Sequence, residues 1–279
     1  MRERNKASVL ARWPIRWLRL RDFFGGAPVA PPAPSESPPD FPLARPFPWE
    51  ARYPAGLAWD LALEPRPLFT LLDDAVATFA NRPCLDFLGR KSSYREIGQL
   101  VDRATKGFQA LGVGPGVRVG LFLPNCPYYV ICFFAVLKAG GTVVNYNPLY
   151  AEREIARQID DSNTSIMVTL NIKATYPKVA RRLADTCLKT IVVGSMGGLL
   201  PWRERTLFAV LRRREIADVP TDARHVRFKM LIANDGAYAP AAIDPGKDVA
   251  VLQYTGGTTG SIATGAYAPS FAISILKRT

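Results

Sequence analysis

Glycine and threonine residues suited to phosphate binding gather in one short stretch late in the sequence. It reads Gln253-Tyr254-Thr255-Gly256-Gly257-Thr258-Thr259-Gly260 and follows the apolar run Asp248-Val249-Ala250-Val251-Leu252. Glycine lets the backbone adopt positive φ and approach an anion closely. Successive N–H groups then form a concave anion nest, and threonine hydroxyls add donors. The chemistry that this stretch predicts is the handling of a nucleotide.

Other interpretations of the stretch can be weighed against this one. A Walker A site is excluded, because Gly260 is followed by Ser261 and no lysine stands nearby. A dinucleotide-binding fingerprint fails as well, since the Gly-x-Gly-x-x-Gly spacing is absent. A flexible loop between strands stays open as an alternative, although a stretch of this length directly after an apolar run is more than an isolated Gly-Gly pair.

Strand-like apolar runs alternate with helical patterns over the middle of the chain, and these elements must position the loop. We predict strands at residues 117–123, 142–146, 165–169 and 188–193, with helices at 128–138, 152–161 and 173–185. Such alternation is typical of βαβ units, so the predicted fold class is α/β, a mostly parallel sheet flanked by helices. Upstream, helices at 69–79 and 94–111 bracket a short β region near 85–88, and glycines within 112–116 end the second helix.

Two motifs in this order resemble the AMP-forming acyl- and aryl-adenylate ligases, the superfamily of acyl-CoA synthetases, luciferases and peptide-synthetase adenylation domains. Residues 253–260 are similar to its phosphate-binding motif. A second segment looks like its upstream motif and is preceded by Pro124-Asn125-Cys126-Pro127; it reads Leu137-Lys138-Ala139-Gly140-Gly141-Thr142-Val143-Val144-Asn145-Tyr146-Asn147-Pro148-Leu149-Tyr150.

Details of the motifs look most like bacterial long-chain fatty acyl-CoA ligases. They are the Asn-Tyr-Asn-Pro-Leu-Tyr variant at 145–150, the Gly256-Gly257 pair in place of Ser-Gly, and Ala233-Asn234-Asp235-Gly236 followed by Asp244-Pro245. The resemblance runs from about residue 67 to residue 260. It implies an N-terminal fragment of such a ligase, with an incomplete α/β domain at 67–260.

The resemblance implies a reaction in two steps. ATP and a fatty acid, a long-chain one by the subgroup, give an acyl-adenylate and pyrophosphate, and the thiol of coenzyme A then displaces AMP. Catalysis of this kind rests on positioning and on donors and Mg²⁺ that absorb phosphate charge. The residues that match the part of the family wrapping the β and γ phosphates are Thr255, Gly256, Gly257, Thr258, Thr259 and Gly260.

Departures from the family begin directly after Gly260. The family continues with a lysine and a glycine, whereas Ser261-Ile262-Ala263-Thr264-Gly265 has threonine before glycine. We expect residues 261–279 to be an aberrant tail, such as a frameshift produces. The family's segments for adenine, Mg²⁺ and ribose and its C-terminal lysine also lack counterparts, so no catalytic residue or metal ligand is assigned. We expect little or no ligase turnover, and a non-catalytic nucleotide-binding or membrane-surface interaction module stays open as the alternative.

The N-terminal part has a separate composition. Residues 1–21 hold seven Arg or Lys against one acid, Glu3, with Trp and Leu interleaved. A basic amphipathic segment on an anionic membrane and a disordered basic tail, at 1–27, both fit this pattern. Residues 28–54 carry ten prolines, which favours an extended linker at 28–66. No nucleic-acid-binding motif accompanies the basic charge, so no nucleic-acid partner is predicted.

The remaining candidate residues offer little chemistry. His225 is the single histidine and lies in a polar stretch, so a catalytic role is not favoured. Cys84, Cys126, Cys132 and Cys187 lack Cys-x-x-Cys spacing and are predicted to be reduced, structural thiols. Arg212-Arg213-Arg214 is predicted to be a solvated helix face rather than a binding patch, and contact with a membrane or an acidic partner stays open. No apolar run is long enough for a membrane span and no cleavable signal is apparent, so the expected location is the cytoplasm, with peripheral contact to the inner membrane open.

Overall fold

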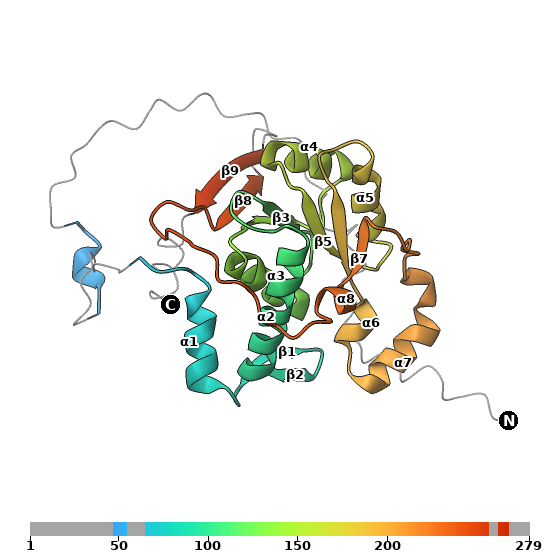
Figure 1. Cartoon of the computed structure of the whole chain (residues 1–279), viewed down its shortest axis with the longest axis horizontal. Coiled ribbons are helices and arrows are strands. Elements are labelled where there is room, and N and C mark those ends of the chain that lie inside the picture. Colours follow the sequence, from blue (N-terminus) through green and yellow to red (C-terminus); the bar gives the residue numbers. More distant parts are fainter. Residues whose placement is uncertain (1–46, 55–64, 257–261, 268–279) are drawn as a thin grey trace. The chain divides into compact units, whose positions relative to one another are not determined.

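A seven-stranded sheet in the order β7-β6-β5-β3-β4-β8-β9 forms the centre of the fold (Figure 1). All neighbouring strands pair in parallel except β8 and β9, which are antiparallel. The predicted α/β fold with a mostly parallel sheet is confirmed. The strands are β3 (Arg118–Leu121), β4 (Thr142–Asn145), β5 (Ile166–Leu170), β6 (Thr190–Gly194), β7 (His225–Arg227), β8 (Val251–Gly256) and β9 (Ile262–Tyr267).

This computed structural model describes residues 47–54, 65–256 and 262–267. The predicted basic tail at 1–27, with the membrane segment suggested at 1–21, lies outside the described residues, as does most of the predicted linker at 28–66. The same holds for 268–279 of the predicted aberrant tail at 261–279. These domain assignments therefore stay predictions.

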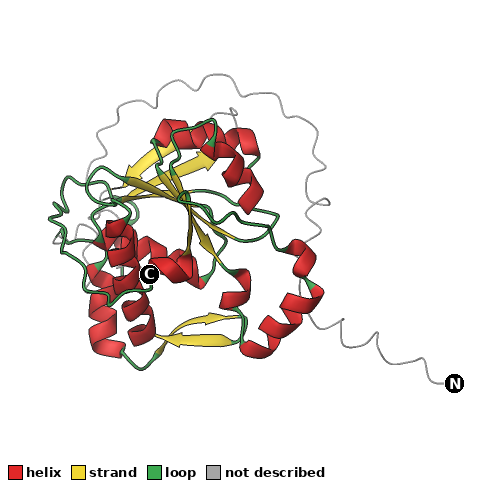
Figure 2. Ribbon diagram, turned by 45° about the vertical axis from the view of Figure 1, so that its right-hand side comes forward, coloured by secondary structure: helices red, strands yellow, loops and turns green. Residues whose placement is uncertain are grey.

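Helices cover both faces of the sheet, because successive strand residues point to opposite sides (Figure 2). Val143 of β4 packs into the core shared with α2 (Tyr94–Ala110) and α3 (Pro127–Lys138). Its neighbour Val144 packs into the core shared with α4 (Glu152–Ser162) and α5 (Tyr176–Ala180). β5 is buried along its whole length, as expected for a parallel strand that is covered on both faces.

Local signals explain where α2 begins and which face it buries. The Ser93 hydroxyl accepts a hydrogen bond from the Glu96 N–H at 3.2 Å, and the Glu96 carboxylate accepts one from the Ser93 N–H at 2.7 Å. This reciprocal pair is a capping box, which satisfies two donors at the helix start. The buried face follows the spacing of an amphipathic helix and includes Ile97, Val101, Ala104 and Phe108.

Smaller elements surround this framework. β1 and β2 pair antiparallel as a separate two-stranded sheet. A Cβ atom on Gly107 of α2 would lie 2.1 Å from the Leu231 carbonyl oxygen, so a glycine is needed where α8 packs against α2. The remaining elements are η4 (Glu50–Arg52), α1 (Thr70–Phe79), β1 (Pro83–Phe87), β2 (Arg90–Ser93), η5 (Arg181–Leu183), α6 (Met196–Leu199), α7 (Trp202–Leu211), η6 (Arg213–Glu215) and α8 (Phe228–Leu231).

Most predicted elements agree with the structure to within two residues at each end, but two predictions need correction. The helix predicted at 173–185 is wrong in extent: α5 begins at Tyr176, and η5 replaces its second half. Pro177 favours a helix start here because it lacks an N–H group and its φ suits the first turn. The arginines at 212–214 lie beyond α7, which ends at Leu211: Arg212 has φ −113° and caps η6, and Arg213 and Arg214 are exposed on that short 3-10 helix.

Candidate functional site

The predicted phosphate loop belongs to the hairpin between β8 and β9. The two strands pair up to Gly256 and Ile262, so residues 257–261 connect them. Thr255 and Gly256 are the last residues of β8, at the end of the sheet where the parallel strands finish. Ligands of open α/β sheets commonly bind at this edge. The other predicted site residues, Gly257, Thr258, Thr259 and Gly260, lie outside the described residues.

A chain of polar side chains fixes the end of β8 next to this loop. Asn145 and Gln253 are register partners on β4 and β8, and the Asn145 amide donates to the Gln253 side-chain oxygen at 2.8 Å. The Tyr129 hydroxyl of α3 donates to the Asn145 side-chain oxygen at 2.9 Å. The Gln158 amide of α4 donates to the Asn145 backbone oxygen at 2.8 Å. Helices from both faces of the sheet therefore hold the strand ends that carry the loop.

Two tyrosines of the motifs are committed to structural hydrogen bonds. Tyr254 of β8 donates through its hydroxyl to the carboxylate of Asp161 in α4. Tyr146, just after β4, donates to the Thr164 hydroxyl at 2.8 Å. Burial raises the pKa of Tyr146 well above its ordinary value, so this phenol stays neutral. Both tyrosines hold the ends of β8 and β4 in place, and neither serves as a general acid or base.

Lys138, in the upstream motif, does not replace the lysine that the family carries after the loop. Its side chain is 5% exposed and pairs with Asp73 at 2.7 Å and with Asp102 at 2.8 Å. Burial acts to lower its pKa, but hydrogen bonds and charge from Asp102 and Asp73 outweigh it and raise the pKa above the ordinary value. The ammonium group ties α3 to α1 and α2 and stays charged there.

A second space lies farther along the same edge of the sheet. A cavity of about 760 Å³ opens at the ends of β5, β6 and β7, a size within the usual range for small-molecule sites. Four strand spacings separate β6 from β8, roughly 19 Å, so this cavity is distinct from the phosphate loop.

The cavity combines cations with an apolar wall. No carboxylate lines it, whereas its cationic side chains are Arg90, Arg205, Arg227 and Lys229. Arg90 donates to the Gly198 carbonyl at 2.7 Å and thereby connects β2 with α6. Its apolar lining includes Phe87, Ile97, Leu100, Ile131, Leu199, Phe228 and Ile232. This chemistry fits an anion with an apolar body.

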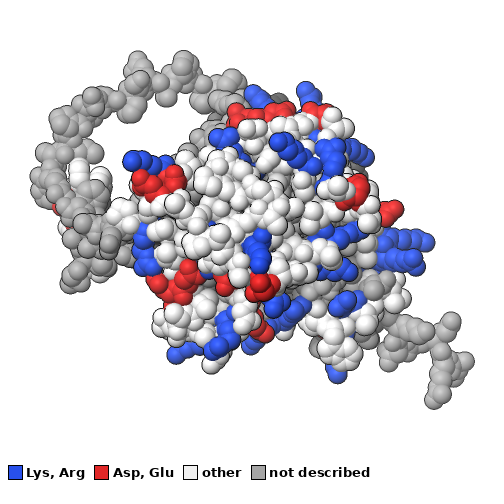
Figure 3. Space-filling model, in the orientation of Figure 1, with Lys and Arg blue, Asp and Glu red and all other residues white. Residues whose placement is uncertain are grey.

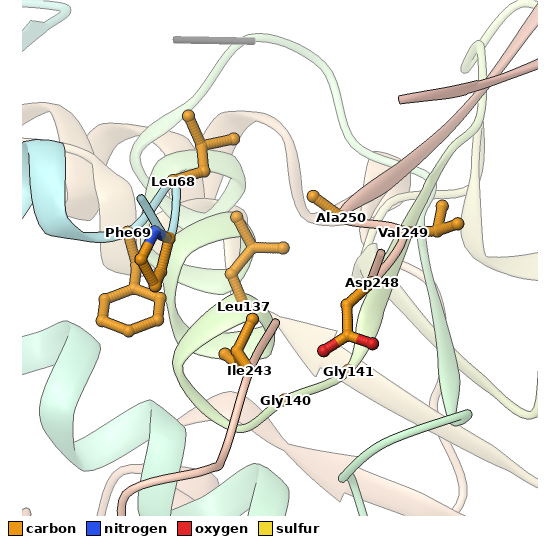
Figure 4. A pocket seen from close by; sticks show the side chains of 10 residues that line it. Leu68, Phe69, Leu137, Gly140, Gly141, Ile243, Asp248, Val249 and Ala250 are labelled. Atoms are coloured by element: carbon orange, nitrogen blue, oxygen red, sulfur yellow. The ribbon is translucent and has the colours of Figure 1, made fainter. Parts of the chain in front are cut away.

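A much smaller pocket lies at the opposite end of the sheet (Figure 4). Its volume is about 30 Å³, close to the share of one water molecule in the liquid. Gly141 precedes β4 and Ala250 precedes β8, so the pocket faces the amino ends of these strands. Its size and position exclude it as a nucleotide site.

His225 and the cysteines have structural surroundings. The His225 ring lies 2.9 Å from the Tyr176 hydroxyl and 2.7 Å from the Asp222 carboxylate, and it starts β7, away from the ends of the strands where the loop lies. All cysteines are free, with Cys126 and Cys132 buried. Burial raises the pKa of both buried thiols, which makes them poor nucleophiles. These residues support the structural roles that the sequence favours.

The geometry defines an α/β protein with a Gly/Thr stretch at the β8–β9 hairpin, and the comparisons with known proteins give its family. Residues 72–261 match the family model described as AMP-binding enzyme. The chain belongs to this family of adenylate-forming acyl-CoA ligases.

Individual relatives specify the likeness further. The chain is 33% identical to a long-chain-fatty-acid–CoA ligase of Bacillus subtilis and 32% identical to one of Escherichia coli, over 77% and 78% of its own length. It covers 38% and 39% of those relatives, about two fifths of their length. A crystal structure of an anthranilate–CoA ligase in complex with anthranoyl-AMP has a TM-score of 0.61 at 21% identity, over 76% of this chain and 36% of that one. At this identity the likeness shows the fold alone.

The sequence pointed to the loop but missed much of what surrounds it. Tyr129 and Gln158 lie on segments that read as ordinary amphipathic or apolar helices, and only the paired strands bring them to Asn145. The cavity cations come from β2, α7, β7 and α8, which are far apart in the sequence. The one available signal was the polar Asn145 at the end of an apolar strand.

Proposed function

We propose that this chain provides the ATP-binding part of an AMP-forming ligase that activates a long-chain fatty acid to acyl-AMP and acyl-CoA. The observation that carries the proposal is the Gly/Thr loop at the β8–β9 hairpin, with β8 fixed to β4 by the Asn145–Gln253 hydrogen bond. In this proposal Thr255, Gly256, Gly257, Thr258, Thr259 and Gly260 hold the β and γ phosphates of ATP.

The long-chain substrate is supported by the bacterial relatives and by the motif variant at 145–150. ATP, coenzyme A and a fatty acid are the ligands expected from the family. Mg²⁺ would accompany the phosphates, but no group of three His, Cys, Asp or Glu side chains in the described ranges is placed to hold a metal ion. No residue is therefore assigned to Mg²⁺.

We propose further that these 279 residues bind ATP with little or no turnover. Acyl transfer needs groups that position both reactants and stabilise the charge that develops on phosphate. The buried and paired Lys138 cannot supply the missing cation. A non-catalytic nucleotide-binding module is the second candidate, and the committed ion pairs of Lys138 fit it as well.

Isothermal titration with Mg·ATP tests the nucleotide site. We expect saturable binding that is lost in Gly257→Val, because a branched side chain blocks the approach of backbone to phosphate. Gly114→Val is the matched control, since a Cβ atom there meets nothing within 4 Å. Equal ATP affinity in the two variants would refute the phosphate loop. Acyl-CoA formation, measured on the same preparation with palmitate and coenzyme A, would refute the proposed inactivity.

A further inference from the structure

Helix α7 exposes more large apolar side chains than any other helix in the described part of the chain. Trp202 is 72% exposed, Val210 77%, Leu211 59% and Leu207 49%. Leu207, Val210 and Leu211 are spaced i, i+3 and i+4, so they lie on one side of the helix. None of the described α7 residues is fully buried. Water is an unfavourable environment for so much apolar surface on one short helix.

Positive charge surrounds this apolar surface. Residues 202–215 hold five arginines (203, 205, 212, 213 and 214) against two glutamates (204 and 215). The Arg203 guanidinium lies 5.0 Å from the centre of the Trp202 ring. Arg213 and Arg214 are exposed. Blue side chains border white surface in the region of α7 (Figure 3).

We infer that α7 and the arginines after it dock this protein on an anionic lipid surface. Tryptophan and leucine partition into the headgroup region of a bilayer, and arginines on the same segment pair with anionic headgroups. A protein partner would need a complementary groove, whereas a bilayer accepts an exposed apolar helix side without one. The described part of the chain holds no helix long and apolar enough to cross a membrane, so the contact is peripheral.

The cavity on the same side of the fold agrees with this inference. Arg205 of α7 lines the cavity, together with Leu199 of α6 and Lys229 of α8. Its cations and apolar wall suit an amphiphilic anion, which is the kind of molecule that dissolves in a bilayer. Docking through α7 would bring the opening of the cavity close to the lipid from which such a ligand comes.

Vesicle sedimentation of the full chain tests the inference. The probes are vesicles of phosphatidylcholine alone and of phosphatidylcholine mixed with phosphatidylglycerol. We expect binding to the anionic vesicles that weakens with salt. Replacing two surface arginines, Arg213→Gln with Arg214→Gln, should lower the partition coefficient about 30-fold. Arg153→Gln with Arg157→Gln is the matched control, because it removes two exposed arginines from α4 and should cause a much smaller loss.

Variants of the apolar side chains distinguish binding through α7 from binding through other parts of the protein. Leu207→Gln with Val210→Gln should abolish vesicle binding, whereas Leu149→Gln, which changes a 64% exposed leucine outside α7, should not. Quenching of tryptophan fluorescence by brominated lipid should disappear in Trp202→Phe. Unchanged binding or quenching in the α7 variants would overturn the inference and point to the basic residues 1–21. Self-association that depends on α7, without vesicle binding, would overturn it in favour of a second copy of the chain.

Discussion

At the scale of single residues, amide groups rather than charges hold the end of β8 against β4. The Asn145–Gln253 pair joins two strands across 108 residues of sequence. The side-chain oxygen of Asn145 also accepts a hydrogen bond from the Tyr129 hydroxyl. The Asn145 side chain therefore connects α3 with β4 and β8. Such networks are sensitive, since a partly buried amide that loses its partner also loses part of its hydration.

Gln253→Ala should weaken ATP binding as well as stability. It leaves the Asn145 amide without its acceptor, so the free energy of unfolding should fall by about 1–3 kcal/mol. ATP affinity should fall because the end of β8 loses its lateral support. Gln109→Ala is the control: Gln109 exchanges two hydrogen bonds with Ala239, at 2.6 and 3.0 Å, away from the loop. Calorimetry on both variants would reject the positioning role if they lost equal ATP affinity.

At the scale of elements, helix α2 is the support on which α1, α3 and α8 pack. Its capping box is the local signal that starts it at Tyr94. Hydrogen bonds from the Ser93 backbone and side chain lower the pKa of Glu96 below its ordinary value of 4.5. The stabilisation from this carboxylate is therefore present above the unfolded-state pKa, and it is lost as the pH falls through the lower folded-state value.

Ser93→Ala should reduce the free energy of unfolding by about 1 kcal/mol near neutral pH, as for other N-cap replacements. The difference from the wild type should shrink below the folded-state pKa of Glu96, because the protonated carboxyl accepts the Ser93 hydroxyl less strongly, and this is one of the bonds that Ser93→Ala removes. Urea denaturation at neutral and at acid pH measures both effects. A difference that stayed constant with pH would show that Glu96 does not take part in the cap.

The elements also show where sequence reasoning succeeds. The apolar strands β3–β6 and the helices α1–α4 have clear periodicity, so their positions were predictable from sequence. β7 was not, because it is three residues long and only Val226 among them is apolar. β9 was not predicted either, because Ile262–Tyr267 lies beyond the end of the family resemblance at residue 260; it pairs with β8 along six residues.

At the scale of the whole molecule, the sheet has a stable centre and weaker edges. β3 and β5 are covered by helices and paired on both sides, whereas β7 is short and pairs with β6 alone among the described strands. Local stability generally follows such burial and pairing.

Native-state hydrogen exchange should reproduce this order. We expect amides of Val168 and Val119 to exchange slowest, through global unfolding, and amides of β7 and of the separate β1–β2 sheet to exchange fastest among the strands. Mg·ATP should slow exchange in β8 and β9 more than in β7, since only the former flank the loop. Equal protection of all strands would contradict the proposed gradient.

The order of the strands in the sheet explains why the cavity could not be predicted from the sequence. A Gly/Thr stretch after an apolar run indicates a phosphate loop by composition alone. The arrangement of the 760 Å³ cavity, by contrast, depends on strand order, because β6 and β7 extend the sheet away from β8 and leave their ends under α6 and α8. No local pattern records which strands become neighbours.

The position of β8 has a consequence for synthesis. β8 is the last parallel strand among the described residues, and it pairs with β4, which is made about a hundred residues earlier. Domains begin to fold while they are made. The sheet can therefore assemble first from β3, β4, β5, β6 and β7, and the edge of β4 that pairs with β8 stays unpaired until β8 is made. The proposed nucleotide site can therefore form only after β8 has been made and has joined β4, so a nascent chain that stops before β8 should not capture ATP.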